Sequence, residues 1–179
     1  MELGPEIAPA ERLSIRPARF EDGGAVLRLI EAALEAGCRG TYSAAQQRAV
    51  FLTYAETLFL DLVNPLDTLV AENGTTIVAV AQLDPAASRL RALFVAAAMQ
   101  GRGLGKVLLA CVERVAEARG VTRIHGAMSL NAVPFYAAAG YRPCPGSDRL
   151  VRTGVTVPVA PMDKALTPLL RKRRPRAIE

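Results

Sequence analysis

Apolar residues recur along the chain at two periods, which together predict where its helices and strands lie. The clearest helical period runs from Gly103 to Arg119 and ends before Gly120, a residue type that commonly follows a helix. Its apolar stripe consists of Leu104, Val107, Leu108, Cys111, Val112 and Val115. Charged residues fall mostly on the opposite side, so we expect an amphipathic helix that packs on a core.

Spacing and capping signals predict three further helices. The first occupies Phe20–Gly37, where apolar residues fall at helical intervals. The second follows Ser43, which can cap it together with Gln46 at the capping-box position, and it should run to about Val63. A shorter helix is expected over Asn131–Ala139.

Strands are predicted where apolar and polar residues alternate, or where short apolar runs end at turn residues. Asn73-Gly74 is a strong hairpin signal, and the last two strands are expected to pair and to turn at Gly154. The predicted strands are 13–16, Thr68–Glu72, Thr76–Asp84, Leu90–Val95, Val121–Ser129, Tyr141–Arg152 and Val155–Lys164. This order of elements predicts a mixed α/β fold, with a twisted, mostly antiparallel sheet of about seven strands flanked by helices.

Composition indicates one globular domain with a neutral body. The chain has 179 residues, of which just over half are hydrophobic and 22% are charged. Its formal net charge is +5, but five of the 22 basic residues lie at 171–176, so the other 17 balance the 17 acidic ones. This distribution argues against nucleic acid as a partner. We expect an N-terminal extension (1–12), one domain (13–166) and a basic C-terminal tail (167–179).

Cysteine use and hydropathy point to a reducing, aqueous compartment. Cys38, Cys111 and Cys144 are odd in number and widely spaced, so the sequence predicts neither a disulfide framework nor a metal site. The N-terminus lacks the features of a signal peptide, and no apolar run reaches the ~18 residues that span a bilayer. We therefore expect a cytoplasmic protein with no membrane partner.

The most informative segment is the glycine-rich loop 100–106, which joins the strand Leu90–Val95 to the helix after it. Glycines let the backbone approach a phosphate, and the first amides of a helix have no internal partner, so the loop predicts a pyrophosphate site. Arg102 and Lys106 add positive charge. A P-loop does not fit because Val107 follows Lys106 in place of a hydroxyl residue, and the glycine spacing does not fit a dinucleotide fingerprint.

Two segments resemble the signatures of the GCN5-related N-acetyltransferase (GNAT) superfamily. Gln100, Gly103 and Gly105 match its pyrophosphate-binding pattern, Gln/Arg-x-x-Gly-x-Gly/Ala. Downstream, Ser129–Tyr136 followed by Gly140-Tyr141 resembles the second signature of the superfamily. The resemblance implies the GNAT acyl-CoA N-acyltransferase fold for the whole domain, and a homodimer.

The resemblance also implies an acyltransferase of the EC 2.3.1 class, which transfers the acetyl group of acetyl-CoA directly to a primary amine of a small molecule or peptide. In the family, an Asn contacts the CoA arm and a Tyr protonates the thiolate, and these roles fall to Asn131 and Tyr136. Asn131 can also cap a helix, and Tyr136 can serve in packing. The residues expected to bind acetyl-CoA are Leu93, Phe94, Val95, Gln100, Gly101, Arg102, Gly103, Leu104, Gly105, Lys106, Asn131, Phe135 and Tyr136.

The sequence does not identify the general base. Many relatives place a carboxylate on the strands beside the acetyl group, whereas Leu90–Val95 contains none. The candidates are Glu72, Asp84 and His125, or an ordered water. Histidine is a common general base, but the strand position of His125 lies far from the expected acetyl site and favours a structural role.

The acceptor amine is equally open. Arg39, Thr41 and Tyr42 lie where the family contacts its substrates, although a loop followed by a helix cap explains them as well. A second hypothesis makes the acceptor a protein N-terminus or lysine. A third is a non-catalytic module that senses acyl-CoA, which binding without thiol release would distinguish.

Overall fold

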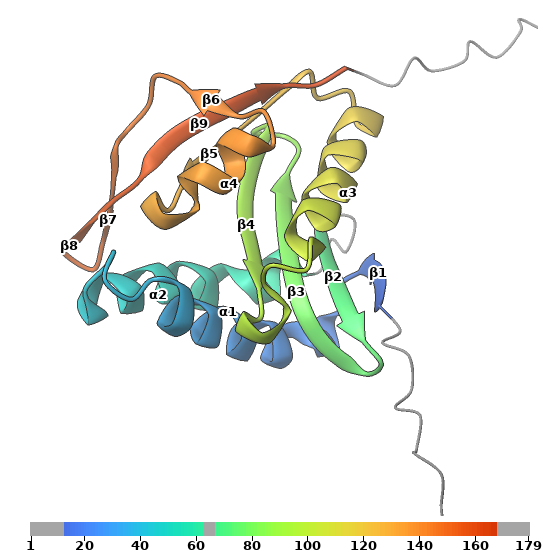
Figure 1. The fold of residues 1–179 in the computed structure, drawn as a ribbon, viewed down its shortest axis with the longest axis horizontal. Helices are drawn as coiled ribbons and strands as arrows, with labels where there is room; N and C mark the ends of the chain where they lie inside the picture. Colours follow the sequence, from blue (N-terminus) through green and yellow to red (C-terminus); the bar gives the residue numbers. More distant parts are fainter. Residues whose placement is uncertain (1–12, 63–66, 168–179) are drawn as a thin grey trace, which may run out of the picture.

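The computed structural model describes residues 13–62 and 67–167, which form an α/β domain (Figure 1). The helices, with short 3₁₀ turns marked η, are η1 (Phe20–Asp22), α1 (Gly23–Gly37), α2 (Ala44–Asp61), η2 (Ala97–Met99), α3 (Leu104–Ala118), η3 (Leu130–Ala132) and α4 (Val133–Ala138). The strands are β1 (Leu13–Pro17), β2 (Thr68–Asn73), β3 (Thr76–Asp84), β4 (Arg89–Val95), β5 (Arg123–Met128), β6 (Arg142–Pro143), β7 (Arg149–Arg152), β8 (Val155–Pro158) and β9 (Ala160–Ala165).

Seven of these strands form one sheet in the order β1-β2-β3-β4-β5-β9-β6. All neighbours in it are antiparallel except β4 and β5, which run parallel. Helices α1 and α2 cover one face of the sheet, and α3 and α4 cover the other (Figure 1). The structure therefore confirms the predicted mixed α/β fold with a mostly antiparallel sheet.

A hydrophobic core lies on each face of the sheet, because the side chains of a strand alternate between its two faces. Leu69 of β2 belongs to the core beneath α3, together with the fully buried Leu108. Its neighbour Val70 belongs to the other core, with Val80 of β3 and Ile30 of α1. The central strands are thus buried on both sides, which explains their continuous apolar runs.

Strands β4 and β5 separate soon after they meet. They are paired through Arg89 and His125, at one end of the contact. In β4 the step from Leu90 to Ala92 opposes a single step of β3, so Arg91 forms a bulge. Beyond the bulge, the edge of β4 that faces β5 has no strand partner among the described residues. The sheet therefore carries a gap in its middle.

Short-range signals in the sequence hold in the structure. Ser43 Oγ accepts a hydrogen bond from the Gln46 amide at 3.3 Å, and Gln46 Oε1 accepts one from the Ser43 amide at 3.0 Å, so the predicted capping box is confirmed. Gly74, with φ of 61°, closes the β2–β3 hairpin. Gly120, with φ of 83°, follows α3 as expected.

The prediction of two long final strands, Tyr141–Arg152 and Val155–Lys164, is wrong. The first segment breaks into β6 and β7, and the second breaks into β8 and β9. Pro143 ends β6 and Pro158 ends β8, because proline has no N–H to donate to a strand ladder. The turn at Gly154 is confirmed, but it joins β7 and β8 in a separate two-stranded sheet, while β9 enters the main sheet.

Several predicted features fall outside the described residues, namely the helix end at Val63, the extension 1–12 and the basic residues 171–176. Helix α2 is described as far as Asp61, with Leu62 after it. Within the described part of the chain, no helix is both long enough and apolar enough to cross a bilayer.

Candidate active site

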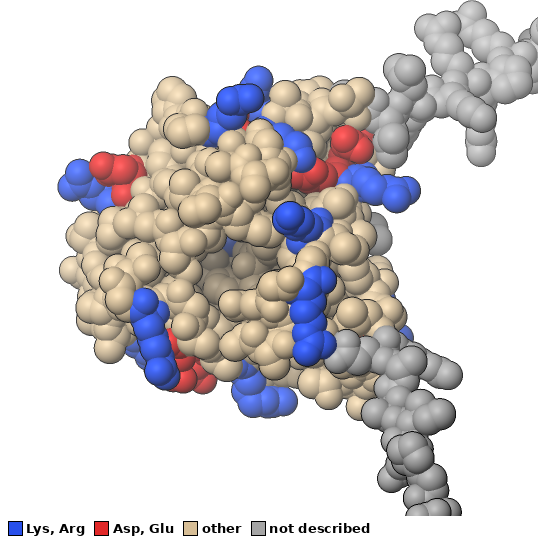
Figure 2. Space-filling view, viewed as in Figure 1, with Lys and Arg blue, Asp and Glu red and all other residues tan. Residues whose placement is uncertain are grey.

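A cavity of about 750 Å³ lies at the gap between β4 and β5. Figure 2 shows a hollow at the centre of one face, with basic side chains on the side where α3 begins. The acidic side chains visible on this face lie away from the hollow. The cavity is lined by the loop before α3 and by parts of α1, α2, β4, α4 and β8, so it brings together segments from most of the chain.

The glycine-rich loop forms one end of the cavity. Gly101 and Gly103 have φ values of 76° and 83°, a left-handed conformation that favours glycine. Gly103 is the N-cap of α3, so the unpaired amides of the first helical turn and the Lys106 side chain face this end. Gln100 Nε2 donates to the Val95 carbonyl at 3.1 Å, which ties the loop to β4. This end is therefore suited to an anion.

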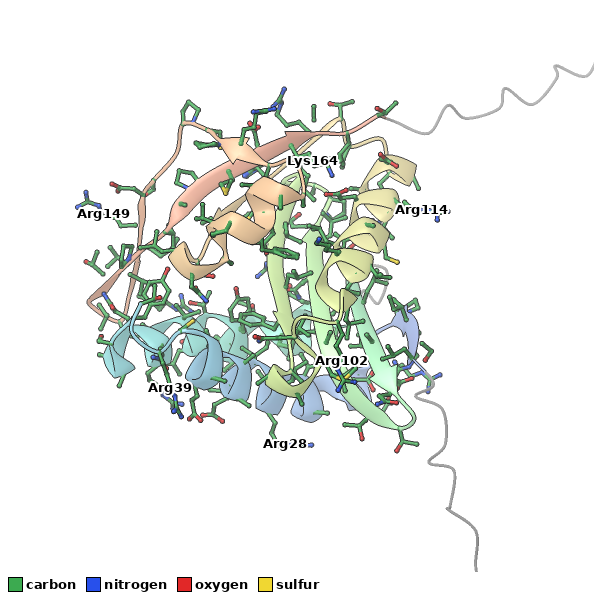
Figure 3. The ribbon with its side chains drawn as sticks, in the orientation of Figure 1. Arg28, Arg39, Arg102, Arg114, Arg149 and Lys164 are labelled. Carbon is green, nitrogen blue, oxygen red and sulfur yellow. The ribbon has the colours of Figure 1, made fainter. Side chains whose placement is uncertain are left out.

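The predicted cofactor residues gather around the cavity. All of them line it except Arg102, which lies beside the start of α3 (Figure 3). Leu93, Phe94 and Val95 contribute the part of β4 that has no pairing with β5. A Cβ at Gly105 would lie 3.5 Å from the Phe135 ring and 3.6 Å from the Val95 side chain, so loop, strand and α4 pack closely here.

Asn131 lines the cavity from η3, and its side chain is anchored to α1. Its Nδ2 donates to the Gly37 carbonyl at 2.9 Å, and its Oδ1 lies 3.9 Å from the Cys38 thiol. The side chain thus satisfies the C-terminal end of α1, whereas η3 and α4 have Ser129 and Ala132 at their N-caps. The amide retains a second N–H that can serve a ligand.

Tyr136 of α4 presents a buried phenol to the cavity. The residue is 5% exposed, and the rings of Phe135 and Tyr141 pack edge-on against it at 5.0 and 5.4 Å between centroids. Among the described residues, no side chain or main-chain group hydrogen-bonds its hydroxyl. Burial raises the pKa of the Tyr136 phenol, so the group remains protonated at neutral pH.

Of the three residues expected near the acceptor, Tyr42 lines the cavity and the other two do not. The Tyr42 hydroxyl accepts a hydrogen bond from the Leu130 amide and donates one to the Pro158 carbonyl, both at 2.8 Å. Arg39 hydrogen-bonds back to α1 and points outward (Figure 3). Thr41 lies between them in sequence but outside the lining.

Apart from Phe94, which was expected to bind acetyl-CoA, the residues of the opposite wall of the cavity are not predicted by the sequence. This wall contains Leu34 of α1, Val50 and Tyr54 of α2, Phe94 of β4, and Leu150 and Val157 of the β7–β8 hairpin. The Tyr54 and Phe94 rings meet edge-on at 5.2 Å. The four-residue spacing of Val50 and Tyr54 marks one face of a helix, but no local signal places that face opposite β8.

The side chains considered as general bases lie elsewhere. Glu72 Oε1 is paired with Arg16 Nη2 at 2.5 Å, and Asp84 Oδ1 accepts from the Ala87 amide at 3.0 Å. His125 Nε2 lies 2.9 Å from the Ala87 carbonyl, at the closed end of the β4–β5 gap. None of these three candidates lines the cavity.

The described lining offers neither a metal site nor an activated nucleophile. No Asp, Glu or His is among the lining residues that the structure describes, and no group of three or more His, Cys, Asp or Glu in that part could hold a metal ion. Cys38 lines the cavity, but burial raises the pKa of its thiol, which disfavours the nucleophilic thiolate. The Cys38 thiol is therefore not set up to attack an acyl group.

Comparison with solved structures identifies the architecture. A GCN5-related N-acetyltransferase from Rhodopseudomonas palustris is 25% identical, with a TM-score of 0.75 over 91% of this chain and 100% of that one. The PaiA N-acetyltransferase from Thermoplasma acidophilum, solved in complex with coenzyme A, is 17% identical, with a TM-score of 0.73 over 86% and 99%. YncA from Salmonella typhimurium, solved with its cofactor acetyl-CoA, is 19% identical, with a TM-score of 0.56 over 93% and 99%.

No curated protein matches the chain in sequence. A family model does match: residues 41–166 fit the acetyltransferase (GNAT) domain, which covers α2, the cavity loop and the strands from β2 to β9. This match extends over more than half of the sequence and agrees with the fold. The chain therefore belongs to the GNAT acetyltransferase family.

Proposed function

We propose that the protein transfers the acetyl group of acetyl-CoA to a primary amine while both are bound in the cavity. The observation that carries the proposal is the Tyr136 phenol, which is buried, protonated and without a protein hydrogen-bond partner among the described residues. It lines the same cavity as the anion-binding loop. A proton donor and a phosphate site in one cavity suit a reaction in which a nucleotide-linked thiolate departs.

The residues present fit acetyl-CoA. The positive-φ glycines Gly101 and Gly103 and the first turn of α3 are suited to its pyrophosphate, and Lys106 adds a charge. The unpaired edge of β4 at Leu93–Val95 offers main-chain groups to the pantetheine arm, and Asn131 offers an amide. Acetyl-CoA supplies the reactive thioester when it is bound.

In the proposed mechanism, the chain orients the thioester and donates a proton. Binding at the loop holds the reacting carbonyl near Tyr136, which lowers the entropic part of the barrier. A main-chain amide near Val95 polarises the carbonyl oxygen. The Tyr136 hydroxyl then gives its proton to the departing sulfur and regains one from water.

Replacement of Tyr136 by Phe tests the proposal. We expect kcat for acetyl transfer to fall about 10²–10⁴-fold, the usual contribution of a general acid, while acetyl-CoA affinity stays nearly unchanged. Thiol release and mass-spectrometric detection of the acetylated amine measure kcat. Equilibrium titration measures the affinity for acetyl-CoA. Full activity in Tyr136→Phe would exclude this phenol as the acid.

Tyr141→Phe is the matched control, because Tyr141 is also a buried phenol but does not line the cavity. It should keep the activity and acetyl-CoA affinity of the native chain. Acetyl-CoA binding with no thiol release from any amine would instead support a non-catalytic acyl-CoA-binding module.

A further inference from the structure

We infer that the acceptor is an amine carried on an apolar, uncharged body, and that it enters the cavity as the free base. The inference rests on the proposed function and names its substrate class. It is carried by the wall of the cavity between α1, α2 and the β7–β8 hairpin. This acceptor wall consists of Leu34, Val50, Tyr54, Phe94, Leu150 and Val157.

The acceptor wall is apolar because its members come from two packed helices and a hairpin that closes over them. Leu34 belongs to the core formed with α1 and α2. Four other side chains of the wall pack against this core, namely Val50, Tyr54, Phe94 and Leu150. The hairpin is held in place from α2, where Gln46 Nε2 donates to the Thr156 carbonyl at 3.0 Å, and Arg152 pairs with Glu56. A substrate body in this space replaces water beside hydrocarbon and aromatic surfaces.

The polar groups at this end are already engaged within the protein. The Tyr42 hydroxyl makes two hydrogen bonds, with Leu130 and Pro158. The Tyr54 hydroxyl donates to the Arg91 carbonyl at 2.9 Å. A substrate with its own polar groups on this side would therefore displace bonds that the fold uses, or leave polar groups without partners.

The charges near the acceptor wall do not favour an ionic acceptor. The charge of Arg91 is balanced by Asp61 of α2, because Arg91 Nη1 lies 2.9 Å from Asp61 Oδ1. Its Nη2 also donates to Thr57 Oγ1 at 3.2 Å. Lys106 lines the cavity at the loop end. Arg39 and Arg149, labelled in Figure 3, point away from the cavity and do not line it.

An ammonium group entering this wall would lose water without gaining a counter-ion. The described lining contains no carboxylate, and its charged side chains, Arg91 and Lys106, are both positive. Burial of an ammonium group without a counter-ion is strongly unfavourable, so the wall selects against charged amines. Polyamines and lysine side chains are therefore disfavoured acceptors, and so are amino acids, because Arg91 is committed to Asp61.

The same lining determines the fate of the amine's proton. In the transfer, the neutral amine nitrogen forms a bond to the acyl carbon as the C–S bond breaks. The amine releases one proton to water, and the sulfur gains one through Tyr136. Because no carboxylate or imidazole among the described lining residues can take a proton from an ammonium, the amine has to arrive unprotonated.

The test compares amines that differ in charge and in the polarity of the group that carries the nitrogen. Acetylation by the native chain is measured with four acceptors. They are an arylamine that is neutral at pH 7, 2-phenylethylamine, a diamine of similar length and a lysine-containing peptide. We expect kcat/KM to favour the two apolar amines by at least about tenfold. For 2-phenylethylamine, kcat/KM should rise about tenfold per pH unit up to the pKa of that amine, whereas for the arylamine it should be flat.

Val50 offers a matched pair of variants, because it lies on the acceptor wall and is half-buried. Val50→Asp places a carboxylate there and should shift preference toward the diamine by at least about tenfold. The Asn side chain has nearly the same shape as Asp but no charge, so Val50→Asn should not shift the preference toward the diamine. Binding of each amine in the presence of CoA, followed by calorimetry, gives a readout that does not depend on turnover.

Each outcome of these experiments either supports or overturns the inferred acceptor class. Preferred acetylation of the diamine or the peptide by the native chain would overturn the inference and leave the proposed function standing. A pH profile that is the same for all amines would also overturn it, because that result requires a base on the enzyme. Binding of the apolar amines without turnover would support the acceptor wall and overturn acetyl transfer. Absence of both binding and turnover would overturn the two together.

Discussion

At the scale of single residues, one hydroxyl connects three distant parts of the site. Tyr42 follows α1, and its hydroxyl bonds the Leu130 amide before α4 and the Pro158 carbonyl at the end of β8. The neighbour of Leu130, Asn131, is fixed in turn to the Gly37 carbonyl. The CoA end and the acceptor end of the proposed site are therefore held together through a few side chains of the α1–α2 connection.

Tyr42→Phe should cost more stability than Tyr54→Phe. The first change leaves the Leu130 amide and the Pro158 carbonyl without their partner, and the second leaves the Arg91 carbonyl alone. Each of these part-buried groups loses a hydrogen bond worth about 0.5–1.5 kcal/mol, so the free energy of unfolding should fall about twice as far in Tyr42→Phe as in Tyr54→Phe. Urea denaturation measures both. Equal losses would contradict the bridging role of Tyr42.

At the scale of elements, an arginine joins the first strand to the turn before α1 and to the second strand. Arg16 of β1 pairs with Asp22 of η1 at 2.7 Å and with Glu72 of β2 at 2.5 Å. The Asp22 and Glu72 carboxylates are 12% and 19% exposed. The cluster orients α1 against the sheet, and α1 supplies one side of the cavity.

The stability that Asp22 provides should depend on pH. Its hydrogen bond with Arg16 lowers the pKa of the Asp22 carboxyl below 3.8 in the folded protein. A carboxyl with a lowered pKa stabilises the fold above its unfolded pKa, and this stability disappears as the pH falls through the folded value. Asp22→Asn should therefore reduce the free energy of unfolding by about 1.5 kcal/mol at pH 7, and by progressively less below about pH 4.

Asp148→Asn is the control for this prediction, because the Asp148 side chain is 73% exposed and pairs with its neighbour Arg149. Its effect should stay within about 0.5 kcal/mol at every pH. Denaturant unfolding of both variants from pH 3 to 7 provides the measurement. A loss in Asp22→Asn that is independent of pH would show that the pair with Arg16 does not stabilise the fold.

Elements were predictable where their signals lie within a few residues. Ser43 and Gln46 cap a helix through contacts three residues apart, and Gly74 and Gly120 adopt the positive φ that their positions require. The glycine loop and the Tyr136 segment belong to the same class, because each is a contiguous motif. These local signals sufficed for the fold class, and they also supplied the residues that we propose bind acetyl-CoA, which remain a prediction.

Features that depend on distant contacts were not predictable. The partners of Tyr42 are 88 and 116 residues away in the sequence, and the acceptor wall combines α1, α2, β4 and the β7–β8 hairpin. The prolines Pro143 and Pro158 were visible, but alternation alone did not reveal that they divide two long segments into four strands. Such features follow from the arrangement of the whole chain rather than from any window of it.

At the scale of the whole molecule, the sheet consists of two parts that meet at the gap. Strands β1–β4 carry one part and β5, β9 and β6 carry the other, and the pair Arg89–His125 joins them. The cavity lies where β4 and β5 diverge, and its lining includes Leu93 from the first part and Met128 from the second. A ligand in the gap would contact both parts, so the proposed function and the integrity of the fold are linked.

Calorimetric titration of the full chain with acetyl-CoA tests the central claim most directly. The proposed site predicts saturable heat with one acetyl-CoA bound per chain, because each chain contains one described gap with its loop, Asn131 and Tyr136. Lys106→Gln should weaken this binding by about 0.5–2 kcal/mol without unfolding the chain, because the exposed Lys106 side chain adds a charge at the loop. A titration without heat, from protein shown to be folded and at more than one temperature, would contradict the account.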